Sequence, residues 1–215
     1  MSGTSDDLRL FVTLNVRPEQ FAGYLRAMQD ELAGARGEPG NLGFDLFQDA
    51  GGTPTIHLFE HWASRAALEQ DHARQPCYIH VRSLEARALT GEVEERYLDE
   101  VDPPQPRLSN AKSAGGGHVR ALVATSADVR PLHHLDQVFA DVAPAFRKAA
   151  GSRFFGLFRN RDNATERLFL ETWQDADARR AGWTIDPARF LSAALDGIPD
   201  KRELRLTDLG NRPAR

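Results

Sequence analysis

The chain has 215 residues, a formal net charge of −4, 27% charged residues and a single cysteine, Cys77. This length suits one large domain or two small ones, and the mild acidity provides no basic surface for nucleic acid or for a membrane. The lone cysteine excludes an intrachain disulfide framework, and the lack of a long apolar run or a signal peptide predicts a cytoplasmic protein.

The first half of the chain alternates between strand and helix patterns. Strands are indicated by alternating polarity and β-branched residues, and helices by apolar residues at a spacing of three and four. Pro18 suits the first turn of one helix, and Pro76 interrupts the other. We expect strand, helix, strand, strand, helix and strand at residues 8–16, 18–37, 42–48, 55–62, 64–90 and 93–98.

A proline-rich run at residues 102–106 and the glycines at residues 115–117 follow. Proline stiffens and glycine loosens such a segment, so we expect a linker. The predicted organisation is therefore an N-terminal domain at residues 1–101, a linker at 102–117 and a C-terminal domain at 118–215.

The second half repeats the order of the first. Asp175 is expected to cap its second helical region. The expected elements are a strand, a helix, a hairpin of two strands, an interrupted helix and a strand, at residues 118–126, 131–149, 153–159, 167–173, 175–195 and 203–209.

The two halves also repeat in sequence, at an offset of 111 residues. Glu60 and Trp62 recur as Glu171 and Trp173, and Gly40 recurs as Gly151. A repeat of this length indicates two copies of one βαββαβ unit, the ferredoxin-like unit. Each sheet would carry both helices on one face, so we expect an α+β fold of two ferredoxin-like domains packed sheet to sheet.

Two segments carry a family resemblance. Residues 38–49 and residues 59–78, which include the Phe59-Glu60-His61-Trp62 run, resemble the antibiotic biosynthesis monooxygenase family. The likeness extends over nearly all of residues 8–101 and is weaker over residues 118–209. Members of that family are dimeric α/β barrels, so this chain resembles both halves of one barrel fused through the linker.

The resemblance implies an activity. Many members oxidise phenols, hydroquinones or anthrones in secondary metabolism with molecular oxygen, without a metal or a tightly bound cofactor, because the substrate supplies the electrons. Some relatives use reduced flavin as a co-substrate for ring cleavage, and others are isomerases or cyclases. We therefore expect a monooxygenase acting on a polycyclic aromatic. A flavin-dependent oxygenase, a non-oxidative enzyme or a binding protein is the alternative.

The resemblance also implies a substrate site. In the family the tryptophan of this motif faces the substrate, so the strand face with Trp62 and Leu58 should line the barrel, with Tyr78 and Phe44 as further substrate-binding candidates. Where some relatives carry an asparagine, this chain has Leu58. Trp62 suits ordinary core equally well. Glu60, on the same face, is expected to be a structural carboxylate.

Three residues are catalytic candidates by the same resemblance. His72 is the preferred acid or base because imidazole titrates near neutral pH, and a solvent-facing histidine is the alternative. Arg82 could hold an oxyanion or lie on a solvated helix face. Asn15 could donate to substrate oxygen, or it could simply end its strand.

The second copy lacks these groups. At the same offset Asn15 becomes Ser126, His72 becomes Trp183, Tyr78 becomes Arg189 and Arg82 becomes Ala193. One working cavity in the first domain is expected. The alternative is an aromatic-binding cavity built by the second domain's Trp173, Trp183 and Arg189.

Other chemistries are not indicated. The seven histidines lack metal-ligand spacing, and no flavin fingerprint is present. The expected partners are a small aromatic substrate and oxygen, and a homodimer is possible through exposed helices or edge strands.

Overall fold

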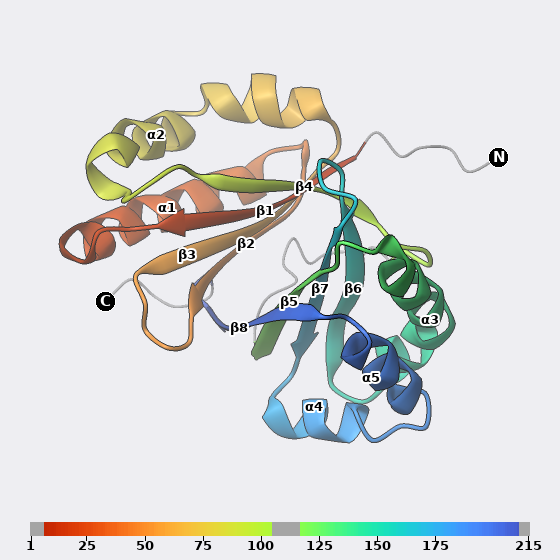
Figure 1. The fold of residues 1–215 in the computed structure, drawn as a ribbon. Coiled ribbons are helices and arrows are strands. Elements are labelled where there is room, and N and C mark those ends of the chain that lie inside the picture. Colours follow the sequence, from red (N-terminus) through yellow and green to blue (C-terminus); the bar gives the residue numbers. More distant parts are fainter. Residues whose placement is uncertain (1–6, 105–116, 211–215) are drawn as a thin grey trace. The chain divides into compact units, whose positions relative to one another are not determined.

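A computed structural model describes residues 7–104 and 117–210 of the chain (Figure 1). The described chain divides into two compact units, which comprise residues 7–97 with 208–210 and residues 98–104 with 117–207. Most of the predicted linker lies outside the described residues, so the domain boundaries given above stay a prediction. No helix in the described ranges has the length and apolarity needed to cross a membrane.

The first unit contains the elements predicted for the first half. The third predicted strand is confirmed residue for residue, at residues 55–62. Three short helical turns lie at Pro18–Gln20, Ala67–Asp71 and His72–Arg74, and the longer elements are β1 (Leu8–Asn15), α1 (Phe21–Gly37), β2 (Asn41–Asp49), β3 (Thr55–Trp62), α2 (Pro76–Ala88) and the start of β4 (Glu94–Glu100).

Strand β3 lies between β1 and β2, and both pairings are antiparallel. Glu60 in β3 is opposite Leu10 of β1 and Phe44 of β2. Alternate residues of a strand point to the same face, so Leu58, Glu60 and Trp62 share one face of β3. This central strand therefore fixes the position of the Glu-Trp motif.

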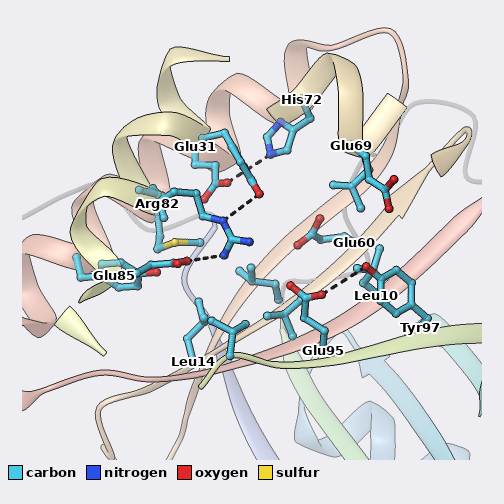
Figure 2. Close-up of a pocket in the computed structure, with 18 residues that line it drawn as sticks. Leu10, Leu14, Glu31, Glu60, Glu69, His72, Arg82, Glu85, Glu95 and Tyr97 are labelled. Carbon is cyan, nitrogen blue, oxygen red and sulfur yellow. Dashed lines mark hydrogen bonds and ion pairs between the residues drawn. The ribbon is translucent and has the colours of Figure 1, made fainter. Parts of the chain in front are cut away.

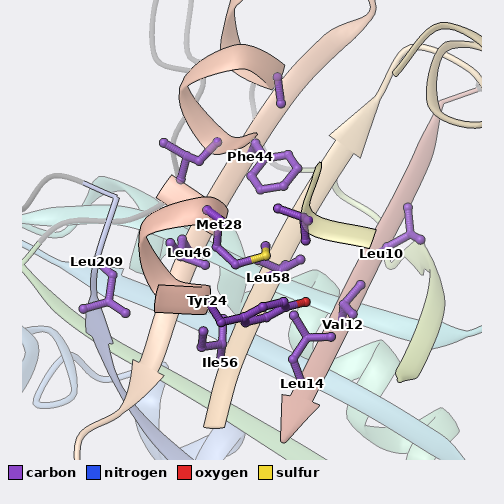
Figure 3. Close-up of a cluster of buried hydrophobic side chains, with 14 of the residues drawn as sticks. Leu10, Val12, Leu14, Tyr24, Met28, Phe44, Leu46, Ile56, Leu58 and Leu209 are labelled. Atoms are coloured by element: carbon purple, nitrogen blue, oxygen red, sulfur yellow. The ribbon is translucent and has the colours of Figure 1, made fainter. Parts of the chain in front are cut away.

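The face that carries Trp62 packs against helices. Its apolar residues form one buried cluster with Tyr24 and Met28 of α1 and Val81 of α2 (Figure 3). The expectation that the Trp62 face lines the barrel is therefore wrong, because the helices cover it. The opposite face is also buried and carries Phe11, which stacks on His57 at 5.4 Å between ring centroids.

The second unit repeats these elements. It contains β5 (His118–Thr125), α3 (Val129–Lys148), β6 (Ser152–Asn160), β7 (Glu166–Trp173), α4 (Ala176–Gly182), α5 (Ala188–Asp196) and β8 (Asp200–Asp208). Strand β7 lies between β5 and β6, and β5 also pairs with β8. As predicted, the Asp175 side chain caps α4 by accepting a hydrogen bond from the backbone N–H of Ala178.

The repeat extends to individual contacts. Arg36 donates from Nε to the carbonyl of Phe44 at 2.9 Å, and Arg147 donates to the carbonyl of Phe155 at 3.0 Å. A Cβ at Gly40 would lie 2.6 Å from Ala67 Cβ. The same is true of Gly151 and Ala178, so only glycine lets the chain approach this closely at either site.

The first strands deviate from the 111-residue offset. Asn15 is opposite Thr55 in β3. In the second unit the counterpart of Thr55 is Glu166, and the residue opposite Glu166 is Thr125. The structural counterpart of Asn15 is therefore Thr125, and its assignment to Ser126 is wrong. The offset is one residue shorter in the first strand because the connections from strand to helix differ in length.

The predicted fold class is confirmed. The chain has a mixed α+β fold. In each unit the strands pair antiparallel, with β3 between β1 and β2 in the first unit and β7 between β5 and β6 in the second.

Candidate active site

The first unit contains a cavity of about 210 Å³ between its sheet and its helices (Figure 2). Leucines of β1 and β3 form the apolar part of its wall. The polar part comes mainly from α1, α2 and β3, and its central members are Glu31, Glu60, His72, Tyr78, Arg82 and Glu85.

Four of the seven predicted site residues line this cavity. They are Leu58, His72, Tyr78 and Arg82. Trp62, Phe44 and Asn15 are not among the residues that line it.

Asn15 is exposed at the end of β1. Its side-chain oxygen accepts a hydrogen bond from the Thr55 hydroxyl at 3.2 Å, and its carbonyl accepts one from the N–H of Thr90. This position does not support the expected role of Asn15 as an oxyanion donor, because the residue ends its strand and is not among the residues that line the cavity.

Trp62 and Phe44 lie behind the cavity and hold His72 in place. Trp62 is fully buried, and its ring lies 4.6 Å from the imidazole ring of His72. Phe44 lies 6.2 Å from the same imidazole, and Tyr78 approaches it edge-on at 5.0 Å. The aromatic groups therefore fix the orientation of the histidine.

His72 is held between two carboxylates. Its Nδ1 lies 2.7 Å from Glu38 Oε1, and its Nε2 lies 3.3 Å from Glu31 Oε1. Burial lowers the pKa of His72, but the hydrogen bonds and charges of Glu31 and Glu38 outweigh burial and raise it. Both ring nitrogens of His72 are thus engaged by carboxylates, and its expected role as acid or base stays a prediction.

Two buried polar atoms on α1 are left without a hydrogen bond inside the described structure. They are Oε2 of Glu31 and the hydroxyl of Tyr24, and both residues line the cavity. Buried polar groups nearly always have a partner, so these two atoms indicate that the cavity accommodates a polar ligand.

Glu60 is the most perturbed carboxylate of the site. It accepts the indole N–H of Trp62 on Oε2 at 2.8 Å, and it makes no ion pair with the residues described. Burial is the largest influence, and it raises the pKa of Glu60 to about 7, with Glu31 and Glu95 contributing in the same direction. Glu60 is thus balanced between its two protonation states near neutral pH.

Arg82 brings a positive charge to the cavity. Its Nε donates to the Tyr78 hydroxyl at 2.9 Å and its Nη1 donates to Glu85 at 2.6 Å, so the side chain is oriented from two sides. It is 41% exposed, which places it at the open side of the cavity. Figure 2 shows its guanidinium pointing from α2 into the cavity.

The matching region of the second unit is filled. Glu171, the counterpart of Glu60, accepts the indole N–H groups of Trp173 and Trp183, each at 2.8 Å, and pairs with Arg179 at 2.6 Å. Trp183 thus occupies the position in the second unit that corresponds to His72 in the first. Arg189 pairs with Asp186 on the surface. The alternative of an aromatic-binding cavity built by Trp173, Trp183 and Arg189 stays a prediction.

No cluster of three or more metal-binding side chains occurs in the parts of the chain that the structure describes. A cavity of about 210 Å³ is smaller than the ~300–1,000 Å³ of sites for drug-sized ligands.

Comparison with known proteins places this site in a family. Residues 8–78 match the family model for antibiotic biosynthesis monooxygenase. This part of the first unit is thus similar to the antibiotic biosynthesis monooxygenase domain. The match includes Glu31, Glu60 and His72, and it ends at Tyr78. No curated protein sequence matches the chain.

Solved structures share the fold of this chain over nearly its whole length. A candidate monooxygenase from Fusobacterium nucleatum has a TM-score of 0.79 at 13% identity, with 96% of this chain and 94% of that chain covered. A second, from Lactobacillus acidophilus, has a TM-score of 0.76 at 13% identity, covering 94% of each chain. An anthrone oxidase-like protein has a TM-score of 0.64 at 11% identity, with 99% and 97% covered. At these identities the likeness shows the fold.

The sequence analysis missed Glu31 and Tyr24 and treated Glu60 as structural. One signal was present for Glu31. It follows Tyr24 and Met28 at helical spacing and so places a charge on the apolar stripe of α1. For Glu60 no local signal exists, because its raised pKa depends on burial by other elements.

Proposed function

We propose that the first unit is a monooxygenase that oxidises an electron-rich aromatic of the phenol, hydroquinone or anthrone type with molecular oxygen in secondary metabolism. The substrate supplies the electrons. The single observation that carries this proposal is the state of Glu60, a buried carboxylate with a pKa of about 7 in a cavity that also contains Arg82.

Glu60 has the properties of a general base. A catalytic base works best when its pKa lies near the working pH, and that of Glu60 does. Its counterpart Glu171 is saturated by two indole groups and an arginine, whereas Glu60 accepts from one indole and borders the cavity. The first unit therefore keeps a reactive carboxylate where the second unit uses it for structure.

Arg82 and Tyr78 suit the anion that deprotonation creates. Nη2 of Arg82 makes no hydrogen bond among the described residues, since Nε and Nη1 take Tyr78 and Glu85. A preorganised cation at the mouth of a cavity with both polar and apolar walls stabilises a phenolate more than water does, because it does not need to reorient. The phenolate can then pass an electron to oxygen.

The overall reaction balances without another reductant. When a phenol becomes a quinone with one molecule of oxygen, one oxygen atom joins the ring carbon and the other leaves as water. The hydroxyl proton and the proton on that carbon both end in the water. Glu60 accepts the first of these protons.

The cavity size favours a small substrate. A volume of about 210 Å³ suits one or two aromatic rings better than a polycyclic anthrone. Benzene- and naphthalene-based phenols and hydroquinones are therefore our first choice within the proposed class.

Oxygen uptake tests this function. Purified protein would be supplied with phenols, naphthohydroquinones and anthrones in an oxygen electrode, with and without reduced flavin, and products would be identified by mass. We expect uptake without flavin and one atom of ¹⁸O from labelled oxygen in the quinone. Strict dependence on reduced flavin would favour the flavin-dependent alternative, and product formed without oxygen would favour an isomerase or cyclase.

A further inference from the structure

Two buried titratable side chains and one partly buried one are connected in a line that the reaction above does not use. Glu31 of α1 contacts His72 at 3.3 Å, and His72 contacts Glu38 at 2.7 Å. The side chains of Glu31 and His72 are 6% and 1% exposed, so charges here interact through protein and not through water. A line of this kind needs a physical reason, since burying charge is costly.

The two ends of the line have different surroundings. Glu31 lines the cavity, and its Oε2 has no hydrogen bond among the described residues (Figure 2). Glu38 follows the last residue of α1, is 12% exposed at its side chain and does not line the cavity. A substrate can therefore contact Glu31, while Glu38 contacts His72 from outside the cavity.

The charges around this line of side chains have opposite effects on the pKa of Glu31. Burial raises the pKa of Glu31, while the hydrogen bond and charge of His72 lower it. Arg82 of α2 also lowers the pKa of Glu31 and Glu85 raises it. Glu60 of β3 interacts with both Glu31 and His72. A protonated His72 therefore helps to keep Glu31 ionised against its burial, and Glu38 helps to keep His72 protonated.

The second unit lacks the whole line. At the 111-residue offset Glu31, His72 and Glu38 become Val142, Trp183 and Ala149, although Glu60 and Trp62 persist as Glu171 and Trp173. The backbone positions correspond, because the N–H of Glu38 donates to the carbonyl of Ala35 and that of Ala149 donates to the carbonyl of Phe146. The first unit, which has the open cavity, thus has this line of three side chains, and the second unit lacks it.

We propose that Glu31 is a second proton-transfer residue of this cavity and that His72 and Glu38 are positioning residues that keep it ready to accept a proton. The inference rests on the proposed oxidation, in which two protons leave the substrate. Glu60 accepts the hydroxyl proton, and Glu31 Oε2 accepts the ring proton as the carbonyl forms. Both protons are then returned to the oxygen atom that leaves as water, so no proton is gained or lost overall.

Glu38→Gln gives the sharpest test, because Glu38 is outside the cavity. Without the Glu38 charge, His72 loses its proton more readily, and Glu31 then loses the neighbouring positive charge. An opposite charge at this range shifts a carboxyl pKa by about 1–3 units. Because both Glu60 and Glu31 must be ionised for turnover, we expect the acid limb of the kcat profile to move to higher pH, with KM little changed. Glu38→Asp should restore much of the shift.

Glu31→Gln and a surface control complete the kinetic set. Losing a proton-transfer residue typically lowers the rate by about 100–10,000-fold, and Glu31→Gln should do so at every pH. Asp30→Asn changes the exposed neighbour of Glu31 on α1 and should leave both the rate and the profile unchanged. A Glu38→Gln profile identical to that of the wild type would overturn the proposal.

A substrate-free measurement separates this inference from the proposed function. In the full-length protein, ¹⁵N NMR of His72 and ¹³C NMR of the Glu31 carboxyl carbon would be followed against pH. We expect Glu38→Gln to lower the His72 midpoint and raise the Glu31 midpoint, whereas Asp30→Asn should move neither. Midpoints that do not respond to Glu38→Gln would overturn the inference even if the enzyme is active. Coupled midpoints in a protein that oxidises no substrate would overturn the proposed function and leave the coupling intact.

Discussion

Trp62 donates its indole N–H to Glu60 at 2.8 Å, two residues earlier on the same face of β3. The second unit repeats this bond from Trp173 to Glu171 at the same distance. The surroundings differ, since Trp183 and Arg179 also donate to Glu171. The same tryptophan–glutamate pair thus occurs in both units, but the carboxylate of Glu171 has further donors that Glu60 does not have among the described residues.

The rate should depend on the ionisation of Glu60. Its pKa is raised to about 7, mainly by burial, so the carboxylate that accepts a proton prevails only above that pH. We expect kcat to rise through about pH 7 and then level off. A rate that is constant from pH 5 to pH 9 would contradict the role of Glu60 as base.

Stability should fall as the pH rises through the same range. In the folded state the pKa of Glu60 is above its ordinary value of 4.5. The folded state therefore binds more protons than the unfolded state between these two pH values, and it loses relative stability as these protons leave. The raised pKa of His72 acts in the same direction, because its stabilising charge is lost at higher pH. Denaturant unfolding at pH 5 and pH 8 should show the lower free energy of unfolding at pH 8, and Glu60→Gln should reduce the difference.

Removing the cation at the cavity mouth should slow the reaction. Loss of one preorganised oxyanion donor typically costs about 100–1,000-fold in rate, and we expect this of Arg82→Met. Arg87→Met serves as the control, since Arg87 is exposed on the same helix and does not line the cavity. Equal rates for the two variants would remove Arg82 from the mechanism.

The second unit should tolerate the loss of its filling side chain without loss of activity. Trp183→Ala removes a ring that packs against Phe146 at 5.2 Å and leaves Glu171 with one donor fewer. Substitutions of this kind cost about 3–5 kcal/mol when the side chain is fully buried, and the half-buried Trp183 should cost less. Thermal unfolding and turnover measured together would show this, and abolished turnover would place the working site in the second unit.

Much of the fold was accessible from the sequence. The βαββαβ order and the repeat depend on local periodicity and on turn residues, and the strand at residues 55–62 was predicted to its exact ends. The orientation of the Trp62 face was predicted wrongly. Alternation separates two faces of a strand but does not say which face meets α1 and α2.

The candidate site was less predictable. His72, Arg82, Tyr78 and Leu58 line the cavity as the resemblance implied. The direction of each pKa shift depends on neighbours distant in sequence, as with Glu31 and His72, which are 41 residues apart. No spacing rule in the sequence reveals such a pair.

The most direct test of the account compares Glu60→Gln with Glu171→Gln. Glutamine keeps the shape of the side chain and can still accept the indole hydrogen bond, so both variants should fold. Oxygen uptake with the best phenol or hydroquinone would be measured at pH 8 for the wild type and for both variants. We expect Glu60→Gln to lose about 100–10,000-fold in rate and Glu171→Gln to retain wild-type turnover with a lower melting temperature. Full activity in Glu60→Gln would contradict the central claim that this carboxylate drives the oxidation.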